Sequence, residues 1–125
     1  MNYLLDTHVF LWAIGDSTRL DKKVAAEIQN TRNAVFVSAV SSVEIAIKSG
    51  LGKLEAPDDL EDEIGLRGFS HLPLRYSHGS GLRALSPHHQ DPFDRMLIAQ
   101  AIEEKLTIIT HDQTFKDYPV GILWT

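Results

Sequence analysis

The sequence contains no cysteine, so neither a disulfide framework nor a zinc site built on thiolates is available to it. It also contains no apolar run long enough to cross a bilayer. No charged leader or cleavage signal precedes the first apolar residues, which begin almost at Met1. These absences exclude several protein classes, and we expect a cytoplasmic protein with no membrane segment.

What the chain does contain is typical of a globular protein. It has 125 residues, of which 43% are hydrophobic, and we expect a single domain over residues 1–125 with a genuine core. The formal net charge is −5, which opposes the approach of phosphate backbones. Either the acidic residues face a partner other than nucleic acid, or they gather where a bound cation reverses the local sign.

The stretch 2–12 organises the prediction of the fold. A short apolar run ends at Asp6, and Val9, Phe10 and Ala13 then share one helical stripe. We interpret this as a buried strand that leads directly into a helix, with Asp6 at the carboxyl end of the strand. In an open α/β sheet, this edge is where ligands bind.

The rest of the chain alternates in the same way. Further strands are predicted at 34–37, 71–74, 106–110 and 120–124. Helices are predicted at 20–31, 38–49, 59–66, 76–85 (weakened by two glycines) and 91–105. Short connections between alternating elements predict a three-layer α/β/α sandwich with a mostly parallel sheet of four or five strands.

Three acids lie at predicted element ends. Asp6 and Asp112 each follow a strand within two residues, where Asp is also a favoured helix or turn cap. Asp94 lies in the first turn of the helix that Asp91 and Pro92 begin, where the helix dipole already favours an acid. Asp91 is the better candidate for a purely structural cap. Taken singly, each acid has an ordinary structural explanation.

Glu44 is more informative, because we expect it within the apolar stripe of its helix. The members of this stripe are Val40, Val43, Ile47 and Leu51. A carboxylate on an inward face is costly unless it is paired, hydrogen-bonded or bound to a metal. One alternative is a capping box that begins at Ser41, which a helix start near Ser38 disfavours. The other, a surface ion pair with Lys48, stays open.

Together these acids predict a metal site. A right-handed α/β winding brings Asp6, Glu44, Asp94 and Asp112 to one edge of the sheet. Carboxylates about 4 Å apart repel each other by roughly 4 kcal/mol per pair at an effective dielectric constant near 20. A cation must therefore neutralise such a cluster, and Mg²⁺ or Mn²⁺ prefers carboxylate oxygen ligands.

Four segments resemble a known family. They are Leu-Leu-Asp-Thr-His (4–8), Ser-Val-Glu-Ile (42–45), Asp-Pro-Phe-Asp-Arg-Met-Leu-Ile-Ala-Gln-Ala (91–101) and Thr-His-Asp (110–112). Their order resembles the PIN-domain ribonucleases, in particular the VapC-type toxins of bacterial toxin–antitoxin pairs, over essentially the whole chain.

The resemblance implies that Asp6, Glu44, Asp94 and Asp112 hold one or two Mg²⁺ or Mn²⁺ ions and that the protein cuts RNA. It also implies a homodimer and a cognate antitoxin encoded alongside. Many relatives carry another acid two residues after the last aspartate, where this chain has Thr114, so a second metal ion is less expected.

Several neighbouring residues are weaker candidates. Thr7 and Thr110 are candidates to position water or phosphate, with strand-end hydrogen bonding as the alternative. Arg95 is a candidate to contact an RNA phosphate or to pair with an acid. The six histidines show no His-x-x-x-His spacing, and we interpret them as structural or solvent-facing. His8 and His111 flank the expected site and are candidates to touch RNA.

Two other functions are compatible with the sequence. One is a catalytically inactive PIN-like binding domain, in which Lys48 and Arg95 neutralise the acids. The other is a phosphatase of the haloacid dehalogenase type, which also places an aspartate at the end of its first strand. That enzyme needs a second acid two residues later, and this chain has His8 there.

Overall fold

Five strands form one sheet in the order β3-β2-β1-β4-β5, and every neighbouring pair is parallel. The structure is a computed structural model that describes residues 1–125. The strands are β1 (Asn2–Leu5), β2 (Ala34–Ser38), β3 (Ser70–Leu72), β4 (Thr107–Thr110) and β5 (Ile122–Trp124). The predicted parallel α/β architecture is confirmed, with the first strand at the centre of the sheet.

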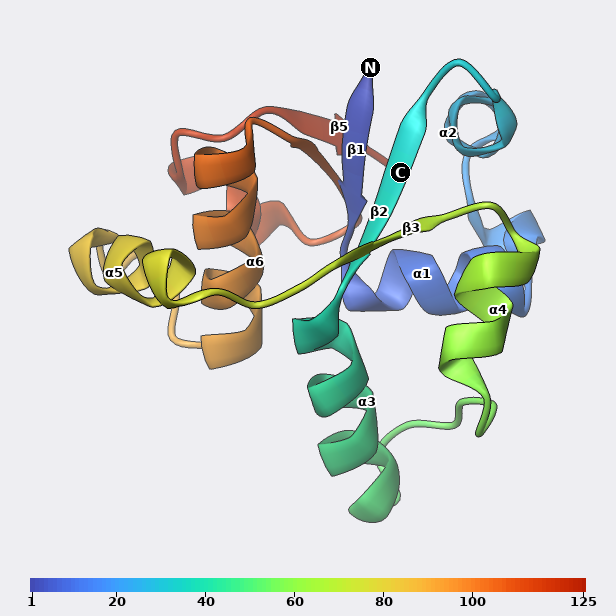
Figure 1. The fold of residues 1–125 in the computed structure, drawn as a ribbon, viewed down its shortest axis with the longest axis horizontal. Coiled ribbons are helices and arrows are strands. Elements are labelled where there is room, and N and C mark those ends of the chain that lie inside the picture. The colour runs from blue at the N-terminus through green and yellow to red at the C-terminus, as the bar shows by residue number, and fades with distance from the viewer.

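Helices cover both faces of this sheet (Figure 1). In the view of Figure 1, α1, α2 and α4 lie on one side of the sheet and α5 and α6 on the other, while α3 extends beyond the carboxyl end of β2. Their bounds are α1 (Thr7–Ile14), α2 (Lys22–Gln29), α3 (Ala39–Gly50), α4 (Leu60–Leu66), α5 (Tyr76–Ala84) and α6 (Pro92–Glu104). No helix has the length and apolar character needed to span a bilayer.

The core forms two layers because side chains alternate along the strands. Tyr3 and Leu5 belong to the cluster under α1 and α2, whereas Leu4 belongs to the cluster under α6. All three side chains are almost fully buried. The interpretation of the first strand as buried on both faces is confirmed, which explains its continuous apolar run.

Some predicted boundaries are wrong for local reasons. The second helix begins at Lys22 and not at Leu20, because Leu20 and Asp21 have extended backbone (ψ 145° and 143°) after a 3₁₀ turn at Ser17–Arg19. β3 runs only to Leu72, because Pro73 has no N–H to contribute to a ladder. A second 3₁₀ turn, Gln113–Asp117, was also not predicted.

The predicted inward face of α3 is also wrong in part. Val43, Ile47 and Leu51 are 51%, 48% and 64% exposed, so most of the expected apolar stripe faces outward. The buried face consists of Val40, Ser41, Glu44 and Ile45. Glu44 is therefore inward as expected, but its neighbours on that face are partly polar.

The start of α3 decides between the alternatives for Glu44. The helix begins at Ala39, and the Ser38 side chain caps it by accepting a hydrogen bond from the Val40 N–H (3.0 Å). Glu44 thus lies in the second turn, where it cannot take part in a capping box at the helix start.

α6 begins and ends with clear signals. Asp91 caps it by accepting hydrogen bonds from the N–H groups of Phe93 (2.9 Å) and Asp94 (3.2 Å), and Pro92 is its first residue. Lys105 ends the helix in the left-handed conformation, with φ 57° and ψ 47°. The cap at Asp91 fixes the first turn and with it the position of Asp94.

Candidate metal centre

The four predicted acids come from four different elements that meet at one edge of the sheet. Asp6 and Asp112 directly follow the region where β1 and β4 end. Glu44 lies in the second turn of α3, and Asp94 lies in the first turn of α6. Because all strands are parallel, their carboxyl ends lie along the same edge, and the helices that follow begin there.

Asp6 is held rigidly at the centre of this edge. It is 5% exposed, its Oδ1 accepts the Val9 N–H (2.8 Å), and its Oδ2 accepts the Thr110 hydroxyl. Burial raises the pKa of Asp6 against the effect of these hydrogen bonds, and the charge of Glu44 raises it further. Asp6 is therefore both the cap of α1 and a buried acid beside another acid.

Glu44 is 2% exposed and bonded at both oxygens. Its Oε1 accepts the Thr7 hydroxyl (2.6 Å), which also lies 2.9 Å from Ser41 Oγ, and its Oε2 pairs with Lys48 Nζ. Burial opposes the charge on Lys48, but the hydrogen bond and charge of Glu44 raise its pKa overall, with help from Asp91 and Asp94. The ion pair with Lys48, which the sequence left as an alternative for Glu44, is thus observed, although the Glu44 carboxylate is buried and not at the surface.

Asp94 responds most strongly to this environment. Burial, together with the charges of Asp91, Glu44 and Asp6, raises the pKa of Asp94 to about 7, although a hydrogen bond with His89 opposes the shift. Burial is the largest cause of this shift, and the charges of Glu44 and Asp6 add to it, so both acids lie within electrostatic range of Asp94. That the three carboxylates share one metal site stays a prediction.

Asp112 differs because it is partly exposed and well hydrogen-bonded. Burial alone would raise its pKa, but the Thr114 N–H (3.0 Å) and hydroxyl (2.7 Å) both donate to Oδ1. With the nearby His89 and His8, these bonds hold the pKa of Asp112 below its usual value. Thr114 therefore keeps Asp112 ionised, which is the state that a metal ligand needs.

His89 is the site residue that sequence reasoning missed. Its Nε2 lies 2.9 Å from Asp94 Oδ2 and 3.4 Å from Thr114 Oγ1. One ligand atom from each of His89, Asp94 and Asp112 lies within 4.8 Å of the others. From the spacing of the histidines, we interpreted His89 as a structural or solvent-facing loop residue. The spacing along the chain cannot show that this loop folds back onto a helix.

The other candidates have contacts of their own. Thr7 and Thr110 bind the carboxylates of Glu44 and Asp6, so their hydroxyls orient the acids. Arg95 does not pair with any of the four acids. Its guanidinium donates to the backbone oxygens of Leu85 (3.2 Å) and Ser86 (2.9 Å) and to Tyr118 Oη (3.3 Å). Those hydrogen bonds fasten the loop before α6.

A hollow of about 400 Å³ opens beside the acids. Asp6 and Asp112 line it together with His8, Trp12 and His111. The His111 ring packs edge-on against Trp12, with ring centres 5.6 Å apart. Asp6 and Asp112 are thus reachable from a hollow large enough for part of a nucleotide or a similar substrate.

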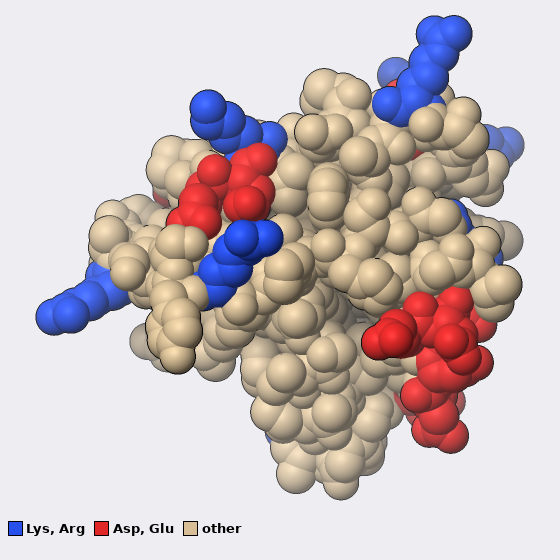
Figure 2. Space-filling view, viewed as in Figure 1, with Lys and Arg blue, Asp and Glu red and all other residues tan.

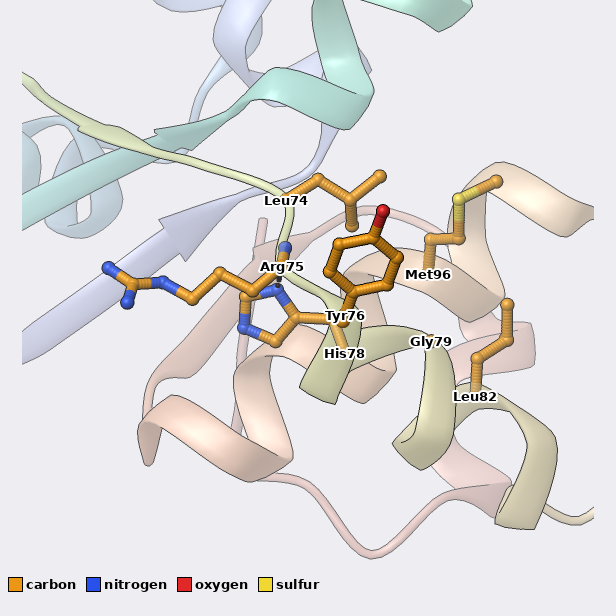
Figure 3. Close-up of a pocket in the computed structure, with 7 residues that line it drawn as sticks. All are labelled: Leu74, Arg75, Tyr76, His78, Gly79, Leu82 and Met96. Carbon is orange, nitrogen blue, oxygen red and sulfur yellow. Dashed lines mark hydrogen bonds between the residues drawn. The ribbon is translucent and has the colours of Figure 1, made fainter.

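A second hollow, of about 420 Å³, lies by α5 and is lined mainly by apolar side chains, including Leu74 and Met96 (Figure 3). Beneath it, His78 Nε2 lies 3.3 Å from Glu103 Oε2 and 3.7 Å from Glu104 Oε2, a grouping that resembles a metal site. However, His78 Nδ1 accepts the Arg75 N–H (2.9 Å), so the proton of the neutral ring is on Nε2. Without a free lone pair on Nε2, His78 cannot bind a metal there.

The residues at the sheet edge fit a divalent cation. They supply carboxylate oxygens from Asp6, Glu44, Asp94 and Asp112, which suit Mg²⁺ or Mn²⁺. Burial is the main cause of the raised pKa values of Asp6 and Asp94, and repulsion from neighbouring acids raises both further. A cation at this position would relieve that repulsion.

Comparisons with known proteins identify similar folds. The fold is similar to two structures with 17% sequence identity and a TM-score of 0.73, each covering 99% of this chain and 98% of the other. Their titles describe VapBC2 from Rickettsia felis bound to a DNA fragment from its promoter, and DNA-bound VapBC from Salmonella typhimurium.

A third similar structure is VapBC-5 from Mycobacterium tuberculosis, described as a member of the VapBC family of toxin–antitoxin systems. It shares 18% identity with a TM-score of 0.60, over 98% of this chain and 96% of the other. Curated protein sequences gave no significant match. A family model described as the PIN domain matches residues 3–121. The chain therefore belongs to the PIN domain family.

Proposed function

We propose that this PIN domain is a Mg²⁺- or Mn²⁺-dependent endoribonuclease and the toxin of a toxin–antitoxin pair. The observation that carries the proposal is the set of largely buried acids Asp6, Glu44 and Asp94 at one edge of the sheet, where burial, and then the charges of neighbouring acids, raise the pKa of Asp94 to about 7. Asp112 completes the set at the edge of the same hollow. Acids with strongly shifted pKa values cluster at functional sites, where a bound cation can offset their repulsion.

In this proposal Asp6, Glu44 and Asp94 hold the ion, directly or through water, and Asp112 closes the site or orients a water. When bound, a divalent ion lowers the pKa of a water molecule, so that hydroxide can attack the phosphate in line with the leaving oxygen. Thr7 and Thr110 keep the carboxylates of Glu44 and Asp6 in fixed orientations. Trp12 and the other residues that line the hollow would limit the space in which RNA binds.

Cleavage of RNA by the purified protein with Mn²⁺ or Mg²⁺ tests this directly. Asp94→Asn should reduce the cleavage rate at least about 100-fold while the fold is retained, because a neutral amide cannot replace a carboxylate ligand. Asp62→Asn, on the exposed face of α4, is the matched control and should cut at the wild-type rate. Undiminished cutting by Asp94→Asn would remove that residue from the mechanism.

The same experiment separates the alternatives. An inactive binding domain, with Lys48 neutralising Glu44, would leave RNA intact at every metal concentration. A phosphatase would release phosphate from small phosphoesters, but the position where it needs a second acid is His8, and the chain belongs to the PIN domain family. Arg95 does not contribute to neutralisation, since its hydrogen bonds go to Leu85, Ser86 and Tyr118.

The antitoxin part of the proposal is supported by the fold likeness to VapBC complexes. We expect the toxin to act in the cytoplasm and the antitoxin to be encoded by a neighbouring gene. Expression of this chain alone should arrest growth, and co-expression of the neighbouring gene should restore it. Arrest by the Asp94→Asn variant would contradict a nuclease origin of the toxicity.

The exposed apolar stripe of α3 supports a homodimer. Val43, Ile47 and Leu51 are each about half exposed or more, and Figure 2 shows almost no charge over α3, in contrast to the acidic side chains gathered over α4. Ile47→Asp should lower the molar mass measured by light scattering from dimer to monomer. Leu66→Asp, at an exposed position on α4, should leave the mass unchanged. A monomeric wild type would exclude the dimer.

A further inference from the structure

The structure holds an imidazole against the acids of the candidate metal centre. His89 lies in the loop before α6, and its Nε2 is 2.9 Å from Asp94 Oδ2. Both side chains are largely shielded, at 18% and 16% exposed. Asp112 offers a carboxylate oxygen within 4.8 Å of both of these atoms. The nitrogen is thus placed among the very oxygens that the proposed function assigns to the ion.

The loop that carries His89 is fastened by contacts of the residues just before the imidazole. Arg95 donates to the backbone oxygens of Leu85 and Ser86, and the His88 ring packs edge-on against Tyr118 with ring centres 5.2 Å apart. These contacts attach the loop to α6 and to the turn after β4. His89 is therefore presented to the acids by a supported backbone, as a metal ligand requires.

The spacing fits shared coordination. Two adjacent ligands that are each about 2.1 Å from an octahedral ion lie about 3 Å apart. The His89–Asp94 separation of 2.9 Å matches this edge. Without an ion, the His89 Nε2–H donates to Asp94; nothing holds Nδ1 as an acceptor, so the proton can move to Nδ1, and the Nε2 lone pair could then bind an ion that Asp94 also contacts.

We propose that His89 is a nitrogen ligand of the metal ion bound by Asp94 and Asp112, and that it favours Mn²⁺ over Mg²⁺ at this centre. The inference rests on the proposed metal-dependent function, to which it adds a ligand and a metal preference. Imidazole suits transition ions, whereas Mg²⁺ prefers oxygen ligands alone. Thr114 stands where many relatives have an acid, and it offers no carboxylate to an ion. His89, whose Nε2 lies 3.4 Å from Thr114 Oγ1, would supply a ligand near that position.

Pulsed electron paramagnetic resonance of the Mn²⁺-loaded protein tests this without relying on activity. The expected result is a ¹⁴N coupling to Mn²⁺ in the wild type that is lost in His89→Asn. By calorimetry, His89→Asn should bind Mn²⁺ at least about tenfold more weakly and Mg²⁺ nearly as well as the wild type, since even outer partners of metal ligands contribute 10- to 100-fold. His71→Asn, at an exposed position of β3 and outside this loop, should keep the coupling and both affinities.

The outcomes distinguish this inference from the proposed function. Mn²⁺ that binds the wild type without ¹⁴N coupling overturns the His89 assignment and leaves the acidic centre intact. A coupling that persists in folded His89→Asn assigns the nitrogen to another residue and also overturns it. Absence of Mn²⁺ binding by the wild type overturns both. If His89→Asn fails to fold by circular dichroism, His89→Gln replaces it, and the wild-type coupling alone still decides whether nitrogen binds the ion.

Discussion

At the scale of single residues, each acid of the centre combines a structural task with an electrostatic one. Asp6 caps α1 and is buried, Glu44 binds Thr7 and Lys48, and Asp112 caps the turn that follows β4. Helix and turn capping by Asp6 and Asp112 and the Lys48 pair of Glu44 are therefore present, and they are compatible with the proposed metal site. A side chain with two hydrogen bonds from the protein is better oriented toward an ion than a free one.

Asp94→Asn should stabilise the metal-free protein in a pH-dependent way. The raised native pKa, about 7, means that the folded state binds a proton more tightly than the unfolded state. Wild-type stability is therefore lost as the pH rises from about 4 through 7, and the variant escapes this loss. We expect its advantage in unfolding free energy to grow by on the order of 2 kcal/mol between about pH 4 and pH 8.

Urea denaturation in the presence of a chelator measures this difference. Asp62→Asn, at an exposed position of α4, serves as the control and should show no such growth. A constant difference between Asp94→Asn and wild type across the pH range would contradict the shifted pKa.

At the scale of elements, the ends of α6 decide where the site lies. The Asp91 cap and Pro92 begin the helix so that Asp94 lies in the first turn, where it contacts His89. At the other end, Lys105 takes the left-handed conformation that glycine adopts without cost. This end of the helix is remote in sequence from the acids, and it can be altered without touching them.

Lys105→Gly should therefore raise the unfolding free energy by about 0.5 kcal/mol. The left-handed conformation costs a residue with a Cβ about 1–2 kcal/mol, and the greater freedom of glycine in the unfolded chain offsets part of the gain. Lys105→Ala removes the same charge but keeps the Cβ, so it should bring no such gain. Thermal or urea melts of the two variants check the comparison; equal stability of both would refute the backbone argument.

At the scale of the whole molecule, the candidate metal centre lies where both layers of the sandwich meet the sheet edge. α1 packs on one face of the sheet and α6 on the other, and the acids Asp6 and Asp94 come from the junctions at which these helices begin. An ion held by both acids would link the two layers. Ion binding should therefore stabilise the native state as a whole, because the unfolded chain has no assembled site.

Mn²⁺ should raise the melting temperature of the wild type. At a free concentration about 100 times Kd, binding adds about 2.7 kcal/mol, which corresponds to roughly 10 °C for a domain of this size. Asp6→Asn should show a much smaller rise, because the central carboxylate is lost. Scanning calorimetry measures the shift, and an equal rise in both proteins would count against a site centred on Asp6.

The sequence by itself determined the main features of the fold. The spacing of apolar residues and the capping, Gly and Pro residues at element ends are local properties that can be read from the chain. The apolar run before Asp6, the helix signal at Asp91-Pro92 and the alternation of strands with helices predicted a parallel sheet, which the structure confirms. The acids were predicted to lie at one edge of that sheet because each follows a strand or begins or belongs to the helix after one. The family resemblance was likewise readable from short segments, and the PIN domain match bears it out.

Tertiary structure alone decided which side chains surround the acids. The outward face of α3 at Val43 and Ile47 was not readable from spacing, because an apolar stripe does not say whether another layer covers it. His89 reaches Asp94 only because Arg95 and His88 fasten its loop back onto the fold. Such contacts join loops to distant elements, and they depend on packing geometry that no periodicity encodes.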